Sequence, residues 1–151
     1  MNLDSYNYEP EATIDDGSCV LEGCTNPDAS NYDETANVDD GSCCIELWGE
    51  CYNIEETISI SYNGDGYDEN YNPNLPLVGE IPPIISQLSN LEILNLPGNS
   101  LTGNLPIELF NLEKLRILNV SRNQLSGQIP GEICQHSIWD SIPGFDDDTE
   151  E

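Results

Sequence analysis

Two stretches decide the fold: LEILNLPGNSLTG at residues 91–103 and LRILNVSRNQLSG at residues 115–127. Their offset is 24 residues, and a proline follows each one at the same spacing, in GNLP and GQIP. Leu94 and Leu96 alternate with Asn95, which is the period of a short strand with one buried face. Because the leucines recur in register, the sequence predicts short coils that stack on one another.

Each coil contains residues that suit a tight path around a core. Asn99 is expected to turn the chain and to bond the backbone of the neighbouring coil with its amide. Gly103 permits a backbone conformation that other residues resist, and Pro106 cannot donate to a sheet ladder. Ordering a residue costs about 1 to 2 kcal/mol and a buried leucine contributes about 1.5 to 3 kcal/mol, so one coil cannot stand alone.

The pattern LxxLxLxxNxLxGxIP resembles that of plant-type leucine-rich repeats, with Leu105 in place of one Ile and Val120 in place of one Leu. The resemblance implies an α/β-type leucine-rich repeat solenoid with a short parallel β-sheet and an irregular or 3-10 convex side. CIELWGEC at 44–51 resembles the N-terminal cap of such domains. In that cap Cys44 would pair with Cys51, and Trp48 would cover the open end of the core.

The resemblance also sets the expected boundaries of this part. The cap is expected at 44–57, and about three repeats at 58–136, the first with an insert at 63–74. Residues 137–151 are expected to form a degenerate cap, built on Trp139 and Ile142, with an acidic tail.

A second repeat precedes the cap. NYEPEATIDDGSC at 7–19 aligns with NYDETANVDDGSC at 31–43, which predicts a truncated copy at 1–22 and a full copy at 23–43. In the full copy Cys24 and Cys43 are expected to close a small disulfide-bonded module. Cys19 would pair with a cysteine before Met1, and Cys134 has no evident partner. The pattern GCxxPxAxNYxxxAxxDDGSC resembles a tandem repeat of secreted and surface proteins of aquatic microbes, which implies an extracellular stalk.

Oxygen-bearing side chains stand at every second position in this module, at 33, 35, 37 and 39. Calcium takes six to eight oxygen ligands, and the candidates are Asp33, Asn37, Asp39 and Asp40. The alternative is a plain turn in which the aspartates bond the backbone. Zinc fits poorly because no CxxC spacing exists. Both the calcium site and the plain turn remain open at this point.

Composition limits the classes of function. The chain of 151 residues has 29 acidic and 3 basic residues, for a formal net charge of −26, so it repels nucleic acid and anionic membranes. Six cysteines indicate an oxidising compartment, and no run of about 18 apolar residues predicts a transmembrane helix. Because the first residues lack the pattern of a signal peptide, we expect a fragment of an extracellular or cell-surface protein.

No catalytic function is predicted. His136 stands alone, without a serine or cysteine that could complete a triad, and no glycine-rich phosphate loop exists. The carboxylates lie on an open acidic surface, which offers no pocket that would raise a carboxyl pKa for acid catalysis. Apart from the possible calcium, no cofactor is expected.

The outward side chains of the strands are expected to form a concave binding face. Domains of this type bind peptides, proteins or glycans there. The candidates are Glu56, Ser59, Ser61 and Tyr62 from the first coil, Glu92, Ile93, Asn95 and Pro97 from the second, and Arg116, Ile117, Asn119, Ser121 and Arg122 from the third.

Two arginines and a sequon stand out on that face. Arg116 and Arg122 could each bind a carboxylate in two-pronged fashion, although Arg116 could instead pair with Glu92 on the next strand. Asn119-Val120-Ser121 is a glycosylation sequon that matters only in eukaryotic secretion. The sequence thus predicts an extracellular recognition module on an acidic stalk, with a structural or adhesion spacer stiffened by calcium as the alternative.

Overall fold

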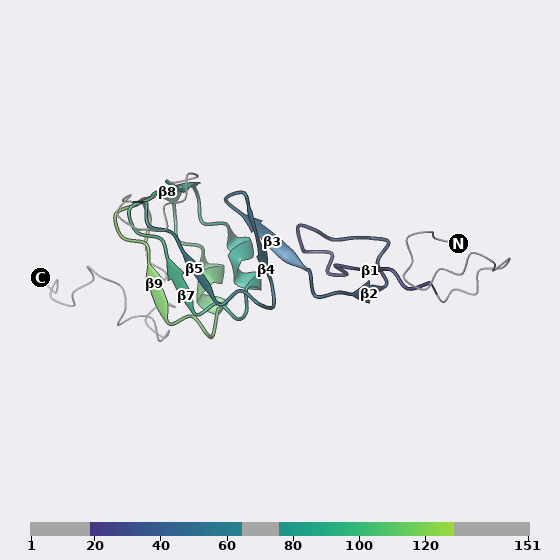
Figure 1. Cartoon of the computed structure of the whole chain (residues 1–151). Coiled ribbons are helices and arrows are strands. Elements are labelled where there is room, and N and C mark those ends of the chain that lie inside the picture. Colours follow the sequence, from purple (N-terminus) through teal and green to yellow (C-terminus); the bar gives the residue numbers. More distant parts are fainter. Residues whose placement is uncertain (1–18, 65–75, 129–151) are drawn as a thin grey trace, which may run out of the picture.

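The computed structural model describes residues 19–64 and 76–128 of the chain (Figure 1). Three short strands, β5 (Ser59–Ser61), β7 (Ile93–Asn95) and β9 (Ile117–Asn119), form a parallel sheet in the order β5-β7-β9. Ile60, Leu94 and Leu118 lie opposite one another in register, and all three are buried. The parallel strands that the repeat predicts are therefore present.

The second half of each coil forms further regular structure. The strands β6 (Val78–Gly79), β8 (Ser100–Gly103) and β10 (Gln124–Leu125) make a second parallel sheet, which the leucine pattern does not predict. The 3-10 helices η1 (Pro83–Gln87) and η2 (Ile107–Asn111) begin directly after Pro82 and Pro106. Proline fixes φ and lacks the N–H, so it ends the ladder and starts the 3-10 turn.

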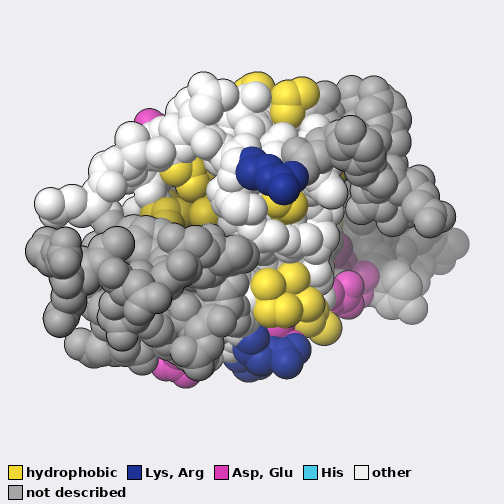
Figure 2. Space-filling model, turned by 90° about the vertical axis from the view of Figure 1, so that its left-hand side faces the viewer, with side chains coloured by type: hydrophobic (Ala, Val, Ile, Leu, Met, Phe, Trp, Pro, Cys, Tyr) yellow, Lys and Arg dark blue, Asp and Glu magenta, His cyan; other side chains and the backbone are white. Residues whose placement is uncertain are grey.

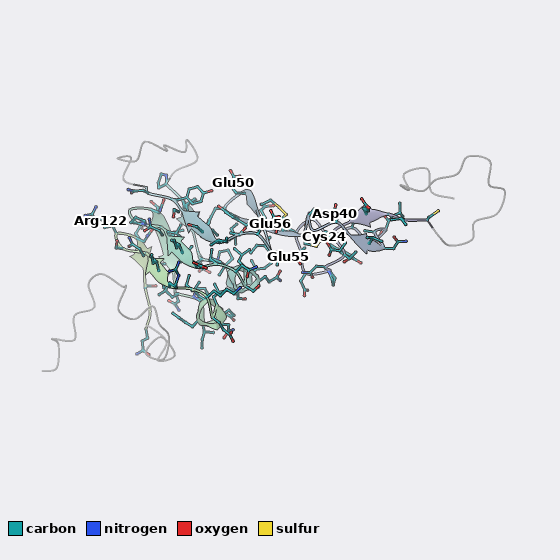
Figure 3. All side chains as sticks on the ribbon, turned by 60° about the horizontal axis from the view of Figure 1, so that its bottom comes forward. Cys24, Asp40, Glu50, Glu55, Glu56 and Arg122 are labelled. Atoms are coloured by element: carbon teal, nitrogen blue, oxygen red, sulfur yellow. A yellow bond between two sulfur atoms is a disulfide. The ribbon has the colours of Figure 1, made fainter. Side chains whose placement is uncertain are left out.

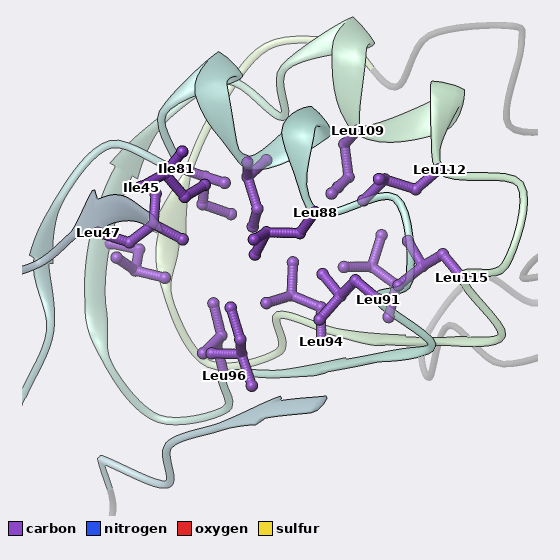
Figure 4. Close-up of a cluster of buried hydrophobic side chains, with 14 of the residues drawn as sticks. Ile45, Leu47, Ile81, Leu88, Leu91, Leu94, Leu96, Leu109, Leu112 and Leu115 are labelled. Atoms are coloured by element: carbon purple, nitrogen blue, oxygen red, sulfur yellow. The ribbon is translucent and has the colours of Figure 1, made fainter. Parts of the chain in front are cut away.

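The core lies between the first sheet and the 3-10 helices (Figure 4). Leu94, Leu96 and Leu118 are fully buried, and Val120 packs partly buried against the same cluster. Further fully buried side chains come from the turns, the 3-10 segments and strand β8: Ile81, Ile85, Leu88, Leu91, Leu101, Leu109, Leu112 and Leu115. The coils share one continuous apolar interior, as stacking requires.

Asn99 connects neighbouring coils through its side chain. Its Nδ2 donates to the backbone oxygens of Tyr62, Leu96 and Pro97 at 3.0, 3.1 and 3.2 Å, and its Oδ1 accepts from Leu77 N–H at 3.0 Å. Asn123 repeats the arrangement one coil later, with Leu101 N–H donating to its Oδ1 at 3.0 Å. The amide thus bonds the backbone of the neighbouring coil, as expected of this position.

A hairpin closes the N-terminal end of the core. Strands β3 (Cys44–Leu47) and β4 (Glu50–Asn53) pair antiparallel, and the disulfide Cys44–Cys51 joins them. Ile45 and Leu47 are fully buried against the repeats, while Trp48 packs partly buried beside them. The two aliphatic residues, which the cap pattern did not single out, therefore cover the core together with Trp48.

The Asp/Cys module precedes the hairpin (Figure 1). Its strands β1 (Glu22–Gly23) and β2 (Val38–Asp39) are parallel, and the disulfide Cys24–Cys43 closes it. Most of the insert expected at 63–74, and all expectations for Cys134, His136, Trp139 and Ile142, lie outside the described residues. Within residues 19–64 and 76–128, no helix has the length and apolar character needed to cross a membrane.

The structure corrects the assignment of Tyr62 to the exposed face. Tyr62 N–H donates to Asn95 O at 2.8 Å, as Leu96 N–H donates to Asn119 O at 2.7 Å, so Tyr62 occupies the inward position of Leu96. It packs partly buried against the core, and the Tyr52 hydroxyl donates to its hydroxyl at 2.7 Å. An aromatic residue stands where the later coils have Leu96 and Val120, and its hydroxyl is hydrogen-bonded by the cap.

This tyrosine pair predicts a pH dependence of stability. Burial, and then the hydrogen bond to Tyr62, raise the pKa of Tyr52 well above its ordinary value of 10.0. A raised pKa in the folded state contributes stability that is present below the unfolded pKa and is lost as the pH rises through the folded one. We expect the free energy of unfolding to fall as the pH rises above about 10, and to fall less in Tyr52→Phe.

Urea unfolding at pH 8 and at pH 10.5 measures the effect, with Tyr32→Phe as the control because Tyr32 is exposed. An equal loss of stability with pH in the wild type and in Tyr52→Phe would contradict the attribution of the pH dependence to Tyr52.

Candidate functional site

The exposed side of the first sheet carries two rows of aligned side chains. One row is Ser59, Ile93 and Ile117, and the other is Ser61, Asn95 and Asn119. These six side chains define the outer face of the first sheet. They project outward because the residue between the rows on each strand points into the core. Ile117 is 40% exposed, so the face combines apolar and amide surface.

Stacking at a constant interval places like positions beside one another. The Nδ2 of Asn119 donates to the Oδ1 of Asn95 at 2.9 Å, across neighbouring strands. The guanidinium of Arg116 donates to the Glu92 carboxylate, so the alternative that Arg116 pairs with Glu92 is confirmed. Both pairs are separated by 24 residues. These side chains are therefore ordered by their neighbours on the same sheet.

A third pair at the same interval was missed by sequence reasoning. Lys114 Nζ donates to Asn90 Oδ1 at 2.6 Å, again 24 residues away. The signal was available, because the repeat aligns Lys114 with Asn90 directly. These contacts lie at the surface, where an ion pair contributes only about 0 to 1 kcal/mol, so their main effect is to orient the side chains.

Arg122 lies apart from Arg116. Arg116 precedes β9 and Arg122 follows it, so the two arginines stand at opposite ends of the strand. Figure 2 shows the basic side chains in two separate places, with apolar and polar surface between them. Arg122 has a φ of 56°, a left-handed conformation that Gly98 takes one coil earlier with a φ of 69°. The two guanidinium groups do not form one joint anion site.

The sequon asparagine is part of the outer face. Asn119 Oδ1 accepts from Ser121 Oγ at 2.8 Å and from Ser121 N–H at 3.2 Å, while its Nδ2 binds Asn95. The amide nitrogen that glycosylation would modify is thus the one that holds the neighbouring strand's side chain.

An open groove adjoins the beginning of the strands. Its volume is about 390 Å³, and it is lined by Glu55, Glu56, Ile58, Asn90, Glu92 and Lys114. Ile58 is 55% exposed there, so carboxylates stand beside apolar surface. Figure 3 shows Arg122 far from Glu55 and Glu56. The groove end of the face carries both signs of charge, because Lys114 lines the groove and Arg116 pairs with Glu92. The exposed Glu55 and Glu56 suit a cationic side chain with an aliphatic stem.

The aspartates proposed as calcium ligands all make local turns. Asp33 Oδ1 accepts from the Thr35 N–H at 2.8 Å and from its hydroxyl at 2.7 Å. Asp39 Oδ1 accepts from Gly41 N–H at 2.8 Å, and Asp40 Oδ1 accepts from Ser42 N–H at 2.9 Å. The Thr35 bonds hold the pKa of the Asp33 carboxyl below its usual value, and bonds from Ser42 do the same for the pKa of Asp40. These are the side-chain-to-backbone bonds of the plain turn.

Asn37, the fourth proposed ligand, uses both ends of its amide. Leu21 N–H donates to its Oδ1 at 3.0 Å, and its Nδ2 donates to Cys19 O at 2.7 Å. In the part of the chain that the structure describes, no group of three His, Cys, Asp or Glu side chains is placed to hold a metal ion. Calcium binding stays a prediction.

Comparisons with known proteins point to one family. The family model described as Leucine Rich Repeat matches residues 90–112 and 114–136. No curated protein matches the chain.

Several solved structures are similar to part of the chain. The ectodomain of the plant membrane receptor kinase GASSHO1/SCHENGEN3 from Arabidopsis thaliana, in complex with CASPARIAN STRIP INTEGRITY FACTOR 2, is 48% identical over 37% of this chain and 7% of its own, with a TM-score of 0.36. The ectodomain of the receptor kinase SOBIR1 from Arabidopsis thaliana is 42% identical over 43% of this chain and 35% of its own, with a TM-score of 0.39.

The BIR3–SERK2 complex from Arabidopsis thaliana is 29% identical over 56% of this chain and 40% of its own, with a TM-score of 0.44. The chain spans at most 40% of the length of these three structures.

The matched residues contain β7, β8, η2, β9 and β10, which are the stacked coils described above. The leucine-rich repeat family is therefore shown for residues 90–112 and 114–136 of the chain.

Proposed function

We propose that the chain is an extracellular interaction module that binds a peptide segment, either free or within a partner protein, across the outer face of the first sheet. One observation carries the proposal: two rows of side chains are aligned across the strands on the outer side of the sheet, and the Asn95 and Asn119 amides hold each other in place. An ordered surface loses less conformational entropy on binding than a flexible one.

The chemistry of the face favours a peptide over a glycan. Its rows combine Ile93 and Ile117 with the amides of Asn95 and Asn119 and with the hydroxyls of Ser59 and Ser61. Branched aliphatic side chains receive apolar side chains, and amides bind peptide N–H and C=O groups. Sugar rings usually stack on aromatic side chains, and neither row contains one.

Charge further restricts the ligand. The net charge of −26 and the carboxylates of Glu55 and Glu56 at the groove favour a ligand with basic residues. Nucleic acid is disfavoured for the same reason. The two disulfides, Cys24–Cys43 and Cys44–Cys51, support a location outside the cytosol.

Selection from a random peptide display library tests this function. We expect the wild type to enrich peptides that contain basic and aliphatic residues, and Ile93→Glu/Ile117→Glu to lose at least tenfold in affinity for them, because two apolar contacts become charged. That loss corresponds to about 1.4 kcal/mol.

The control is Val78→Glu, which places the same charge on an apolar side chain of the second sheet that is 66% exposed. Its affinity should match the wild type. Peptides that bind all three proteins equally, or a wild type that enriches none, would refute binding at this face.

A structural spacer is the second candidate, and the hydrogen bonds between the Asp/Cys module and the cap favour it. Asn53 Nδ2, for example, donates to Gly41 O at 2.7 Å. In the calcium form of this proposal, an ion at Asp33, Asn37, Asp39 and Asp40 would stiffen the spacer. The dense carboxylates support that form, whereas their turn bonds favour a module that is stable without an ion.

Substitutions of Asp40 separate these two forms. If Asp40 acts only as a turn acceptor, Asp40→Asn should keep the melting temperature because an amide oxygen still accepts from Ser42 N–H, and Asp40→Ala should lower it. Calcium and EDTA should then give equal melting temperatures in all three proteins. A melting temperature that rises with calcium in the wild type, and less in Asp40→Asn, would establish the ion site instead.

A further inference from the structure

The boundary between the Asp/Cys module and the repeat cap has no linker. Cys43 belongs to the disulfide that closes the module, and the next residue, Cys44, belongs to the disulfide of the cap hairpin. Two units joined by one peptide bond can still rotate about its neighbouring dihedrals. Their relative orientation therefore depends on the contacts that cross the boundary.

Asn31 of the module holds the chain where it leaves. Its Oδ1 accepts from Cys44 N–H at 2.9 Å, and its Nδ2 donates to Ser42 O at 2.8 Å. The adjacent Ser30 adds two bonds to the cap strand. Its N–H donates to Cys44 O at 2.8 Å, and its Oγ accepts from Glu46 N–H at 2.8 Å.

The cap reaches back to the module in turn. Ile54 N–H donates to Cys43 O at 2.9 Å, and Asn53 Nδ2 donates to Gly41 O. The side chain of Ile54 also packs against the small buried cluster of Cys24, Ala29 and Cys43. The boundary is thus crossed by hydrogen bonds in both directions and by an apolar contact.

Asn37 repeats the same arrangement where the chain enters the module. Its amide binds the carbonyl of residue 19 and the N–H of residue 21, just as Asn31 binds the carbonyl of residue 42 and the N–H of residue 44. Each asparagine spans a carbonyl and the N–H two residues later. The module therefore fixes both the entering and the leaving chain with one amide each.

We propose that residues 21–43 form a rigid connector, which sets the direction of the repeat domain relative to the chain before it, and that Asn31 and Asn37 are its two clamps. The connector holds the outer face of the first sheet in a fixed orientation whether or not that face binds a peptide. An experiment can therefore show that the connector is flexible without showing that the outer face binds no peptide, and the reverse. A flexible stalk, in contrast, would let the two parts reorient independently.

Nuclear magnetic resonance on the full chain with native disulfides tests the rigidity. Amide relaxation should give residues 21–43 and the repeats 76–128 one common rotational correlation time, and residual dipolar couplings from both parts should fit one alignment tensor. A shorter correlation time for the module, with a separate tensor, would overturn the connector.

Variants test the clamp. Asn31→Ala should shorten the correlation time of the module and speed exchange of the Cys44 amide proton by about fivefold to tenfold, because that N–H loses its acceptor. Asn31→Asp keeps the acceptor, so it should retain most of the protection of Cys44. Asn111→Ala, which removes an exposed asparagine of η2, is the matched control.

Unchanged dynamics and unchanged Cys44 exchange in Asn31→Ala would refute the role of Asn31. If Asn31→Ala does not fold, the wild-type couplings and the exchange in Asn31→Asp still decide the matter.

Discussion

The structure depends on the buried amide of Asn99. This side chain is only 5% exposed and is the one buried polar side chain within residues 19–64 and 76–128. It satisfies carbonyls of its own turn and of the preceding coil, and it receives the N–H of Leu77. A buried polar group is costly unless its bonds are made, so the coils must meet at this spacing for the amide to be paired. Asn123, which is partly buried, makes the equivalent bonds one coil later.

Once the spacing between the coils is fixed, it also determines which side chains are neighbours on the outer face of the first sheet. Coils that repeat every 24 residues place Asn95 beside Asn119 and Glu92 beside Arg116, so the outer face is a ladder of like positions. The same stacking leaves the first coil with an open end, which Ile45, Leu47 and Trp48 of the cap cover. The cap, in turn, is the element to which the Asp/Cys module is bonded. Through the cap, the repeats are thereby bonded to the Asp/Cys module.

Much of the repeat domain could be predicted from sequence because its signals are local and periodic. The alternation of Leu94 and Leu96 predicts the strand, and the interval predicts the partner of Arg116. Tyr62 was misplaced although the alternation puts it inward, because it follows Ile60 by two residues as Leu96 follows Leu94. Its hydrogen bond to Tyr52 of the cap could not be read from the sequence. The second sheet was missed because its strands lack the leucine alternation of the first sheet: Leu101 is the one buried residue among β6, β8 and β10.

The roles within the Asp/Cys module could be predicted only in part. The closing disulfide was foreseen, whereas the bonds from Asn37 to the entering backbone were not. Calcium binding by Asn37 stays a prediction. An amide or carboxylate oxygen suits a cation and a backbone N–H equally well, so residue type alone cannot distinguish the two roles. Residue type was also a poor guide at Arg122. Its backbone is left-handed, like that of Gly98 at the equivalent position one coil earlier, and an arginine gives no sign of that conformation.

The free energy of unfolding of Asn99→Ala tests the central claim most directly, with Asn111→Ala as the reference for an exposed asparagine. If the buried amide sets the spacing of the coils, Asn99→Ala should lose about 2 to 4 kcal/mol in urea unfolding, because Leu77 N–H and the carbonyls of the turn lose their partner inside the protein. A loss no larger than that of Asn111→Ala would show that leucine packing alone holds the coils together, and would contradict the account.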